Sequence, residues 1–350
     1  MNWICKTFIV LCCSTVLIFS ASSLVVARSA QVSTTKTKVV KKRTAISQKH
    51  RYHRVKVTRK SVAKRATHSV ASKRGSGGGL ALRITARSAM IMDAVTGQAI
   101  YAQASDVPAQ PASTIKVLTG VISLDSLKKN ELVPVSQRAA MMPRSKIYLR
   151  AGRKYPANDL INAVLLASAN DASVALAEKI AGSEQTFAKL MTAKAKSFGA
   201  TNTVCKTANG LTANGQYTTA HDLAKIFNSA MRNNEFARKM SVVKLANTDG
   251  KIIRSHNRAL WQVAGAEGGK TGYTQAARKT YVGKFKRNND EIVVALMGSE
   301  TMWEDVRALV EYGFSKKRNG AATTSRSSRD PRLLVQLGNS PRQLPLASSL

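Results

Sequence analysis

The chain has 350 residues and a formal net charge of +36 at pH 7, from 55 Lys and Arg against 19 Asp and Glu. The charge is too uneven for one globular unit, because residues 1–92 hold 19 of the 55 basic residues and no acidic residue, which leaves +17 for the rest. Charge alone would suggest nucleic acid as a partner, but the export features of the N-terminal segment argue against a nucleic-acid-binding protein.

Residues 1–27 have the features of an export signal. Lys6 gives a positive start, residues 7–27 carry no charge, and Val25-Val26-Ala27 offers small residues for cleavage. The same segment is just long enough to span a bilayer, so an uncleaved anchor is the alternative. Either way, we expect an exported protein of the periplasm or cell envelope.

Residues 28–84 are expected to form a disordered basic tether. They are mostly Lys, Arg, Ser, Thr, Val and Ala, show no periodic apolar face, and include the run from Gly75 to Gly79. Residues 28–79 could contact anionic lipid or an anionic envelope polymer, or could simply be a solvated linker. Beyond a catalytic domain over 85–315, residues 316–350 are again rich in Ser, Arg, Gly and Pro and are predicted to be a flexible basic tail.

The segment 85–315 begins and ends with strands. A turn at Thr96-Gly97 joins two predicted strands at 88–93 and 98–101, and further strands are predicted at 268–273, 280–286 and 291–297. Amphipathic or alanine-rich helices are predicted between and after them, one containing Ser113 and others at 158–166, 171–180, 185–198, 218–231 and 301–312. This order predicts an α+β fold in which one antiparallel sheet collects both ends of the domain.

Ser113 and Lys116 stand at the head of the first of these helices. Positions i and i+3 share a helix face, so the Lys116 amine can lie beside the Ser113 hydroxyl. Pro111 favours a helix start here, and unpaired N–H groups in the first turn favour an anion forming nearby. The pattern therefore predicts a base next to a serine nucleophile.

The order of three motifs distinguishes this Ser-x-x-Lys from the others in the chain, which begin at Ser33, Ser61, Ser126 and Ser241. Ser168-Ala169-Asn170 follows in a predicted loop between two helices, and Lys270-Thr271-Gly272 follows in a predicted strand. Ser-x-x-Lys, Ser-x-Asn and Lys-Thr-Gly in this order are the signature of penicillin-binding proteins and class A β-lactamases.

Over residues 86 to 315 the chain resembles the serine D-Ala-D-Ala carboxypeptidases, the low-molecular-mass penicillin-binding proteins. Further matching stretches are Asp93 with Thr96-Gly97, Pro111 to Ser113, Ser168 to Ala172, Asn209 to Leu211 and Lys270 to Thr274. The resemblance implies a five-stranded antiparallel sheet packed with helices plus a helical cluster, with the active site between them. One departure is Ala277-Arg278, where the family usually has Ala-Gly, and it bears on the geometry of the strand there.

The resemblance implies acyl transfer in two halves, in which Ser113 attacks the penultimate D-alanine carbonyl and the acyl-enzyme is then hydrolysed. Lys116 acts as base only if its pKa falls from about 10.4 toward 7, which costs roughly 4 to 5 kcal/mol. A second cation, Lys270, would promote that fall. Ser168 would relay a proton to the leaving D-alanine, and Asn170 would orient Lys116 and the substrate amide.

The remaining implied roles concern recognition. Lys270 and Thr271 would bind the substrate carboxylate, Gly272 would let the substrate approach the strand, and the N–H groups of Ser113 and Tyr273 would form an oxyanion hole. The expected partners are peptidoglycan stem peptides, with β-lactams as inhibitors. No cofactor or metal is implied.

Several alternatives stay open at this stage. Ser168-Ala169-Asn170 could be an ordinary turn, since Ser255-His256-Asn257 is a second Ser-x-Asn, and His221 and His256 are interpreted as structural. An endopeptidase acting on D-Ala crosslinks would use the same acyl donor. A β-lactamase is less favoured because no Glu-x-x-Leu-Asn pattern lies between Asn170 and Lys270. Intact motifs argue against a silent peptidoglycan-binding protein.

Overall fold

The computed structural model describes residues 83–327. The predicted export signal, the predicted tether up to residue 82 and residues 328–350 of the predicted tail lie outside the described residues. Among the residues that are described, no helix is both long enough and apolar enough to cross a membrane.

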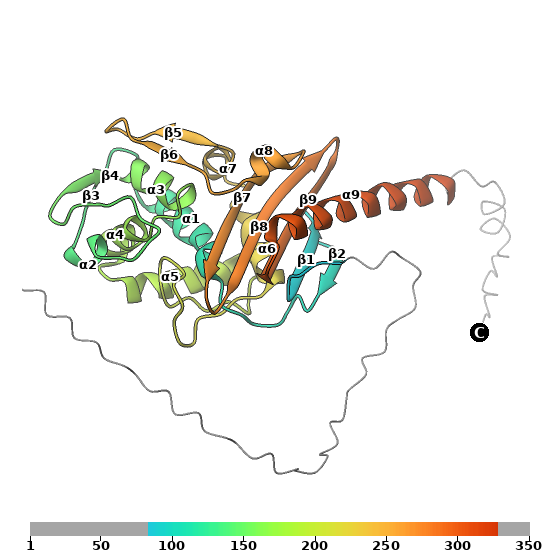
Figure 1. The fold of residues 1–350 in the computed structure, drawn as a ribbon, viewed down its shortest axis with the longest axis horizontal. Coiled ribbons are helices and arrows are strands. Elements are labelled where there is room, and N and C mark those ends of the chain that lie inside the picture. Colours follow the sequence, from blue (N-terminus) through green and yellow to red (C-terminus); the bar gives the residue numbers. More distant parts are fainter. Residues whose placement is uncertain (1–82, 328–350) are drawn as a thin grey trace, which may run out of the picture. The chain divides into compact units, whose positions relative to one another are not determined.

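A five-stranded antiparallel sheet forms the centre of the described fold (Figure 1). Its strands, in spatial order, are β2 (Ala99–Gln103), β1 (Ser88–Asp93), β9 (Asp290–Ser299), β8 (Arg278–Arg287) and β7 (Ala266–Thr274). The N-terminal hairpin joins the C-terminal strands through β1, where Ile91 pairs with Val294 of β9. The predicted α+β fold with its five-stranded sheet is confirmed.

Strand alternation sends apolar side chains to both faces of this sheet. Met90, Val293 and Ala295 face the helical cluster, whereas Ile91 and Val294 face the C-terminal helix. Helix α6 (Ala220–Ala230) covers the first face and α9 (Met302–Ser327) covers the second (Figure 1). The sheet is therefore a buried central layer, and its outer strand β7 is left as an edge beside the helical cluster.

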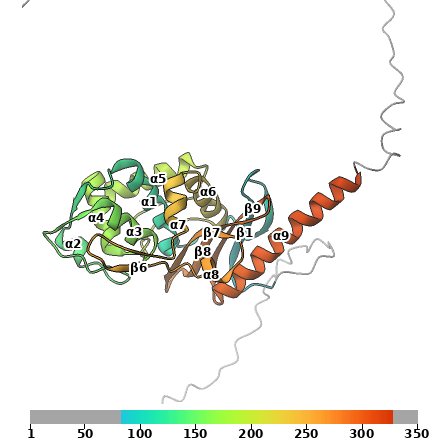
Figure 2. The ribbon, with the colours of Figure 1, turned by 90° about the horizontal axis from the view of Figure 1, so that it is seen from above.

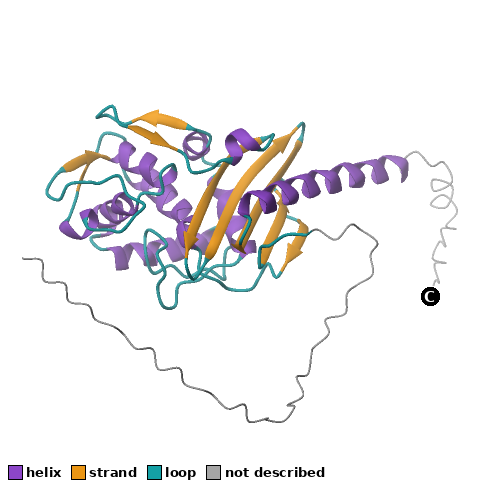
Figure 3. Cartoon of the chain, viewed as in Figure 1, coloured by secondary structure: helices purple, strands orange, loops and turns teal. Residues whose placement is uncertain are grey.

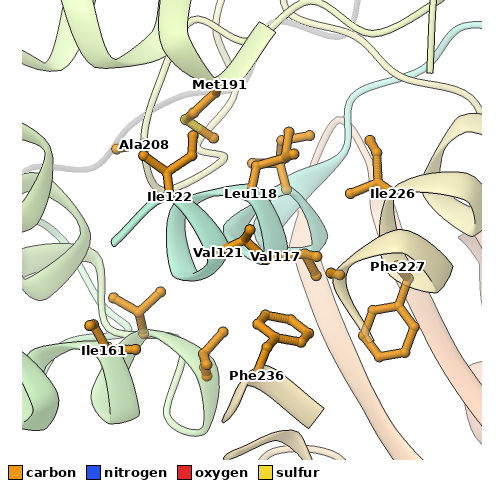
Figure 4. Packing of buried hydrophobic residues seen from close by; sticks show 14 of the residues in the cluster. Val117, Leu118, Val121, Ile122, Ile161, Met191, Ala208, Ile226, Phe227 and Phe236 are labelled. Atoms are coloured by element: carbon orange, nitrogen blue, oxygen red, sulfur yellow. The ribbon is translucent and has the colours of Figure 1, made fainter. Parts of the chain in front are cut away.

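The helical cluster surrounds α1 (Lys116–Ser126), which is preceded by one 3₁₀ turn, η1 (Ala112–Ile115). Figure 4 shows Val117, Leu118 and Val121 of α1 among side chains from several other helices. Full burial of these apolar side chains contributes roughly 1.5–3 kcal/mol each, so α1 is held firmly in place. Its first residue, Lys116, is buried with them.

The other elements are further helices and two small two-stranded sheets, coloured by type in Figure 3. The remaining helices are α2 (Gln137–Ala140), α3 (Ala157–Leu165), α4 (Asn170–Ala181), α5 (Glu184–Ser197), α7 (Asn234–Met240) and α8 (Ala259–Gln262). One small sheet pairs β3 (Leu132–Pro134) with β4 (Lys154–Pro156), and the other pairs β5 (Lys244–Ala246) with β6 (Ile252–Arg254).

Helix α9 is longer than the helix predicted over 301–312, and it passes position 315, the predicted end of the catalytic domain. Figure 2 shows it extending away from the sheet. Lys317 forms ion pairs with Asp93 at 2.6 Å and with Asp290 at 3.3 Å. The basic composition after Phe314 suggested a tail, but these strand-end carboxylates bind the helix at that point.

Candidate active site

The cleft of interest lies between the edge strand β7, the turn η1 and the junction of α3 with α4. It encloses about 750 Å³, and its wall contains six of the eight predicted site residues, namely Ser113, Ser168, Asn170, Thr271, Gly272 and Tyr273. The other two, Lys116 and Lys270, are buried behind that wall, with 0% and 1% of their surface exposed. The structure thus brings all eight together.

Ser113 lies in η1 rather than in the first turn of an α-helix, which begins three residues later at Lys116. The 3₁₀ geometry aligns positions i and i+3 closely, so the expected neighbourhood is preserved. Lys116 Nζ lies 2.9 Å from Ser113 Oγ.

Two carbonyl oxygens also accept hydrogen bonds from Lys116. Its Nζ donates to Asn170 Oδ1 at 2.8 Å and to the Asn209 backbone oxygen at 2.6 Å. Neither oxygen can donate in return, so a neutral Lys116 amine would use both of its N–H groups on them. The nitrogen lone pair is then left facing the Ser113 hydroxyl.

The surroundings favour that neutral form. Burial, and next the nearby charge of Lys270, hold the pKa of Lys116 well below its usual range, with Asp171 and Glu184 acting in the opposite direction. A buried amine with a lowered pKa can take a proton from a hydroxyl near neutral pH.

Asn170 is held in one orientation by the chain that passes over it. Its Nδ2 donates to the carbonyl oxygens of Pro143 at 3.0 Å and Arg144 at 3.2 Å, and its backbone N–H donates to Ser145 at 2.8 Å. With the amide nitrogen used in this way, Oδ1 is directed to Lys116. The loop that fixes Asn170 also lines the cleft through Arg144 and Ser145.

Ser168 and Lys270 form the second polar pair of the cleft. Ser168 adopts φ +58° at the sharp turn between α3 and α4, and its Oγ lies 2.9 Å from Lys270 Nζ. Lys270 also donates to the Thr271 oxygen at 3.1 Å. Burial lowers the pKa of Lys270 to about 7, so at neutral pH its side chain readily holds or releases a proton.

Gly272 lets β7 approach the nucleophile. An ideal Cβ at this position would lie 2.4 Å from Thr280 Oγ1 and 2.8 Å from the Ser113 nitrogen. Gly210, at φ +76°, has no room either, since a Cβ there would lie 2.0 Å from the Ala112 oxygen. Both glycines therefore bring backbone against η1.

The departure at Ala277-Arg278 is absorbed by the turn between β7 and β8. Arg278 adopts φ +57° and pairs with Thr274, while the Ala277 N–H donates to Thr274 Oγ1 at 3.0 Å. Strand β7 keeps its pairing with β8 along the Lys-Thr-Gly motif, so the unusual residue does not disturb the cleft. As the edge strand, β7 leaves backbone groups unpaired on its outer side, where an extended peptide could bind.

Some neighbours of the cleft were not predicted as site residues. The Asn209 carbonyl contacts Lys116, and Arg258 and Trp303 line the cleft. His256 also lines it, and its pKa is lowered to about 4 by burial and by Lys270 and Lys116. The sequence signal for Asn209 was its place before a turn glycine, whereas nothing local marked Arg258 or Trp303.

The second Ser-x-Asn contributes only its middle residue, His256, to the cleft wall. Asn257 is buried, and its Oδ1 accepts hydrogen bonds from the Tyr281 hydroxyl at 3.3 Å and from the Ala259 N–H at 3.2 Å. It holds strand β8 against the start of α8. The choice of Ser168 over Ser255, which was made from motif order, agrees with this placement.

Comparison with known sequences points to one family. A family model for D-alanyl-D-alanine carboxypeptidase matches residues 76–301. The D-alanyl-D-alanine carboxypeptidase DacB2 of Mycobacterium tuberculosis is 36% identical over 241 residues, which cover 66% of this chain and 82% of that protein. DacF of Bacillus subtilis is 30% identical over 274 residues, covering 73% of this chain and 70% of the relative.

Solved structures agree with the sequence comparison. A D-alanyl-D-alanine carboxypeptidase from Mycobacterium tuberculosis H37Rv matches with a TM-score of 0.65 and 34% identity, over 68% of this chain and 94% of the other. Penicillin-binding protein D2 of Listeria monocytogenes, in its ampicillin-bound form, matches with a TM-score of 0.62 and 26% identity, over 67% and 99%. The predicted fold and enzyme class are confirmed, and the chain belongs to the D-alanyl-D-alanine carboxypeptidase family.

Proposed function

We propose that this protein removes the terminal D-alanine from peptidoglycan stem peptides through an acyl-enzyme on Ser113, with Lys116 as the general base. The observation that carries the proposal is the set of partners around Lys116. Two carbonyl acceptors, at 2.8 and 2.6 Å, occupy the N–H groups of the neutral amine and direct its lone pair to Ser113 Oγ at 2.9 Å.

In the first half-reaction Lys116 takes the Ser113 proton while Oγ bonds to the penultimate D-alanine carbonyl carbon. The carbonyl oxygen becomes an oxyanion, which the backbone N–H groups of Ser113 and Tyr273 stabilise. The amide C–N bond then breaks, and the proton passes through Ser168 to the leaving nitrogen. Ser168 suits this relay because its hydroxyl already accepts a hydrogen bond from Lys270.

In the second half-reaction water attacks the acyl carbon. Lys116 takes the water proton, the bond from carbon to Ser113 Oγ breaks, and the lysine returns a proton to Oγ. The free enzyme is thereby regenerated without any other group.

Lys270 and Thr271 bind the carboxylate of the terminal D-alanine. The Lys270 ammonium supplies the charge and Thr271, which lines the cleft, supplies a hydrogen bond. Penicillins carry a comparable carboxylate beside a reactive amide, so they acylate Ser113 as well. Peptide mapping after reaction with a labelled penicillin should find one adduct, on Ser113. An adduct on another residue would contradict the proposal.

The main alternative is endopeptidase action on D-Ala crosslinks, in which the acyl donor is the same and only the leaving amine is larger. Incubation with a D-Ala-D-Ala pentapeptide and, in parallel, with crosslinked muropeptides separates the two activities. Free D-alanine from the pentapeptide without cleavage of the crosslinks is the expected result. Cleavage of the crosslinks at a comparable rate would favour the alternative.

We also propose that residues 1–27 direct export and that residues 28–79 hold the enzyme near anionic envelope components. These residues contain no group that the proposed chemistry needs. A shortened chain beginning near Leu80 should keep its turnover of a soluble peptide and lose its association with envelope fractions. Loss of peptide turnover in a folded shortened chain would show that the basic arm belongs to the active site.

A further inference from the structure

Glu184, in the first turn of α5, is a buried carboxylate that contacts the turn following Thr207. Only 4% of its surface is exposed. Its Oε1 accepts hydrogen bonds from the Ala208 N–H at 3.0 Å and from Asn209 Nδ2 at 3.5 Å. Its Oε2 pairs with Arg138, whose side chain is half exposed.

The same turn contacts the catalytic helix on its other side. The Ala208 oxygen accepts a hydrogen bond from Thr119 Oγ1 at 2.6 Å, and the Asn209 oxygen accepts one from Lys116 Nζ at 2.6 Å. The turn is thus held between the Glu184 carboxylate and helix α1. Its position decides where the Asn209 oxygen meets the lysine.

We propose that Glu184 is a positioning residue for acylation, which places Lys116 by holding the turn of Ala208 and Asn209 against it. The inference rests on the proposed role of Lys116 as general base. Glu184 does not touch Ser113 or the cleft, and it acts through the one backbone oxygen that Lys116 contacts.

Charge gives Glu184 a second effect on the same lysine. The charged groups that face Lys116 are Lys270 from β7, Asp171 from α4 and Glu184 from α5, and His256 is kept neutral nearby. Lys270 lowers the pKa of Lys116, and the two carboxylates raise it. Removing the Glu184 charge should therefore lower that pKa further.

The two effects can be separated by substitution. Glu184→Gln keeps an oxygen for the Ala208 N–H and loses the charge together with the Arg138 ion pair, whose half-exposed guanidinium can turn to water. Glu184→Ala loses the oxygen as well as the charge, and leaves the Ala208 N–H unpaired. Asp222 offers a matched control, since it is a buried first-turn carboxylate of α6 that accepts the Asn202 N–H at 2.7 Å and lies outside the Lys116 network.

The test measures the acylation rate with a labelled penicillin from acid to neutral pH, for the whole protein and for Glu184→Gln, Glu184→Ala, Asp222→Asn and Asp222→Ala. Both Glu184 variants should move the acid limb to lower pH. Only Glu184→Ala should also lower the plateau rate, by roughly tenfold, while the glutamine variant stays within about threefold. In the folded Asp222→Asn and Asp222→Ala variants, the acid limb of the acylation rate should stay in place.

An unchanged acid limb in Glu184→Gln would overturn the proposal, and so would a plateau in Glu184→Ala equal to that of the unsubstituted protein. An equal fall in folded Asp222→Ala would also overturn it, because the effect would then be one of general stability. If Glu184→Ala does not fold, Glu184→Asp replaces it, because its shorter side chain keeps the charge but withdraws the oxygen from the Ala208 N–H. Its plateau rate should fall while its acid limb stays in place, and an unchanged plateau would overturn the proposal. If the labelled penicillin does not acylate the unsubstituted protein at any pH, the proposed function itself is overturned, and this inference with it.

Discussion

Lys270 donates a 2.9 Å hydrogen bond to the Ser168 hydroxyl, although 102 positions separate the two residues in the sequence. Asn170, two residues after Ser168, accepts a hydrogen bond from Lys116 at 2.8 Å. The tripeptide from Ser168 to Asn170 therefore contacts both buried lysines. Ser168 contacts Lys270 of the edge strand, and Asn170 contacts Lys116, the neighbour of the nucleophile. The three motifs form a single polar network. Because the site needs all three, one motif found alone does not predict it.

The pKa of about 7 at Lys270 predicts an alkaline limb in peptide turnover. Because burial depresses this pKa, the ammonium that recognises the substrate carboxylate is present below about pH 7 and is lost above it. We expect kcat/KM for a D-Ala-D-Ala peptide to fall as pH rises through this value.

Lys270→Arg provides the control for this prediction, because a guanidinium does not titrate in the same range. Its kcat/KM should show no alkaline limb near pH 7, whatever its absolute value. The same limb in both proteins would assign the titration to another group.

Gly272 should tolerate no side chain. In Gly272→Ala the new methyl group would collide with Thr280 Oγ1 and with the Ser113 nitrogen. Overpacking of this kind costs roughly 1–3 kcal/mol and would push η1 away from β7, so penicillin acylation should fall by about 100-fold. Gly283→Ala, which overpacks against the Tyr281 ring on β8, should reduce stability but leave the acylation rate of the folded protein close to normal. Equal losses of rate in the two variants would argue against a local effect at Ser113.

Asp305 should be a stability residue and not a functional one. Its carboxylate is 2% exposed and accepts hydrogen bonds from the Thr85 N–H at 2.9 Å and from Ser299 Oγ at 2.7 Å. Asp305→Ala leaves these donors unpaired and should lower the free energy of unfolding in urea by about 2–4 kcal/mol. The folded variant should be acylated at the normal rate. A loss below about 0.5 kcal/mol would mean that the chain near Thr85 is not held by this carboxylate.

The sequence was most informative where periodicity or a motif acts over a few residues. The strands of the central sheet are short apolar runs bounded by turn signals, as in Ser88–Asp93 before Thr96-Gly97, and their order along the chain was enough to predict one sheet that joins both ends. The two small two-stranded sheets have strands of three residues, such as Lys244–Ala246, which are too short for a pattern. Helix α9 is joined at Lys317 to the distant carboxylates of Asp93 and Asp290, and no local pattern encodes these contacts.

The site follows the same rule. Side chains within motifs, such as Ser113 and Lys116, could be predicted because residue type and spacing carry their chemistry. The contact of Asn209 with Lys116 could not, although its turn was recognised, because the contact uses a backbone carbonyl that any residue possesses. Glu184 could not either, because its contact with the Ala208 N–H exists only after α5 has packed against the turn.

The central claim is that Lys116 is the base and that Lys270 keeps its pKa low. It is tested most directly by a pH series of penicillin acylation rates for the unsubstituted protein and for Lys116→Ala, Lys116→Arg, Lys270→Ala and Lys270→Arg. Both Lys116 variants should lose acylation, because neither alanine nor a guanidinium can accept the Ser113 proton near neutral pH.

In the same series Lys270→Arg keeps a cation and should retain measurable acylation. Lys270→Ala removes the positive charge that depresses the pKa of Lys116, so that pKa should rise and the acid limb should move to higher pH. Acylation of Lys116→Arg at the rate of Lys270→Arg, or an acid limb that Lys270→Ala leaves in place, would contradict the account.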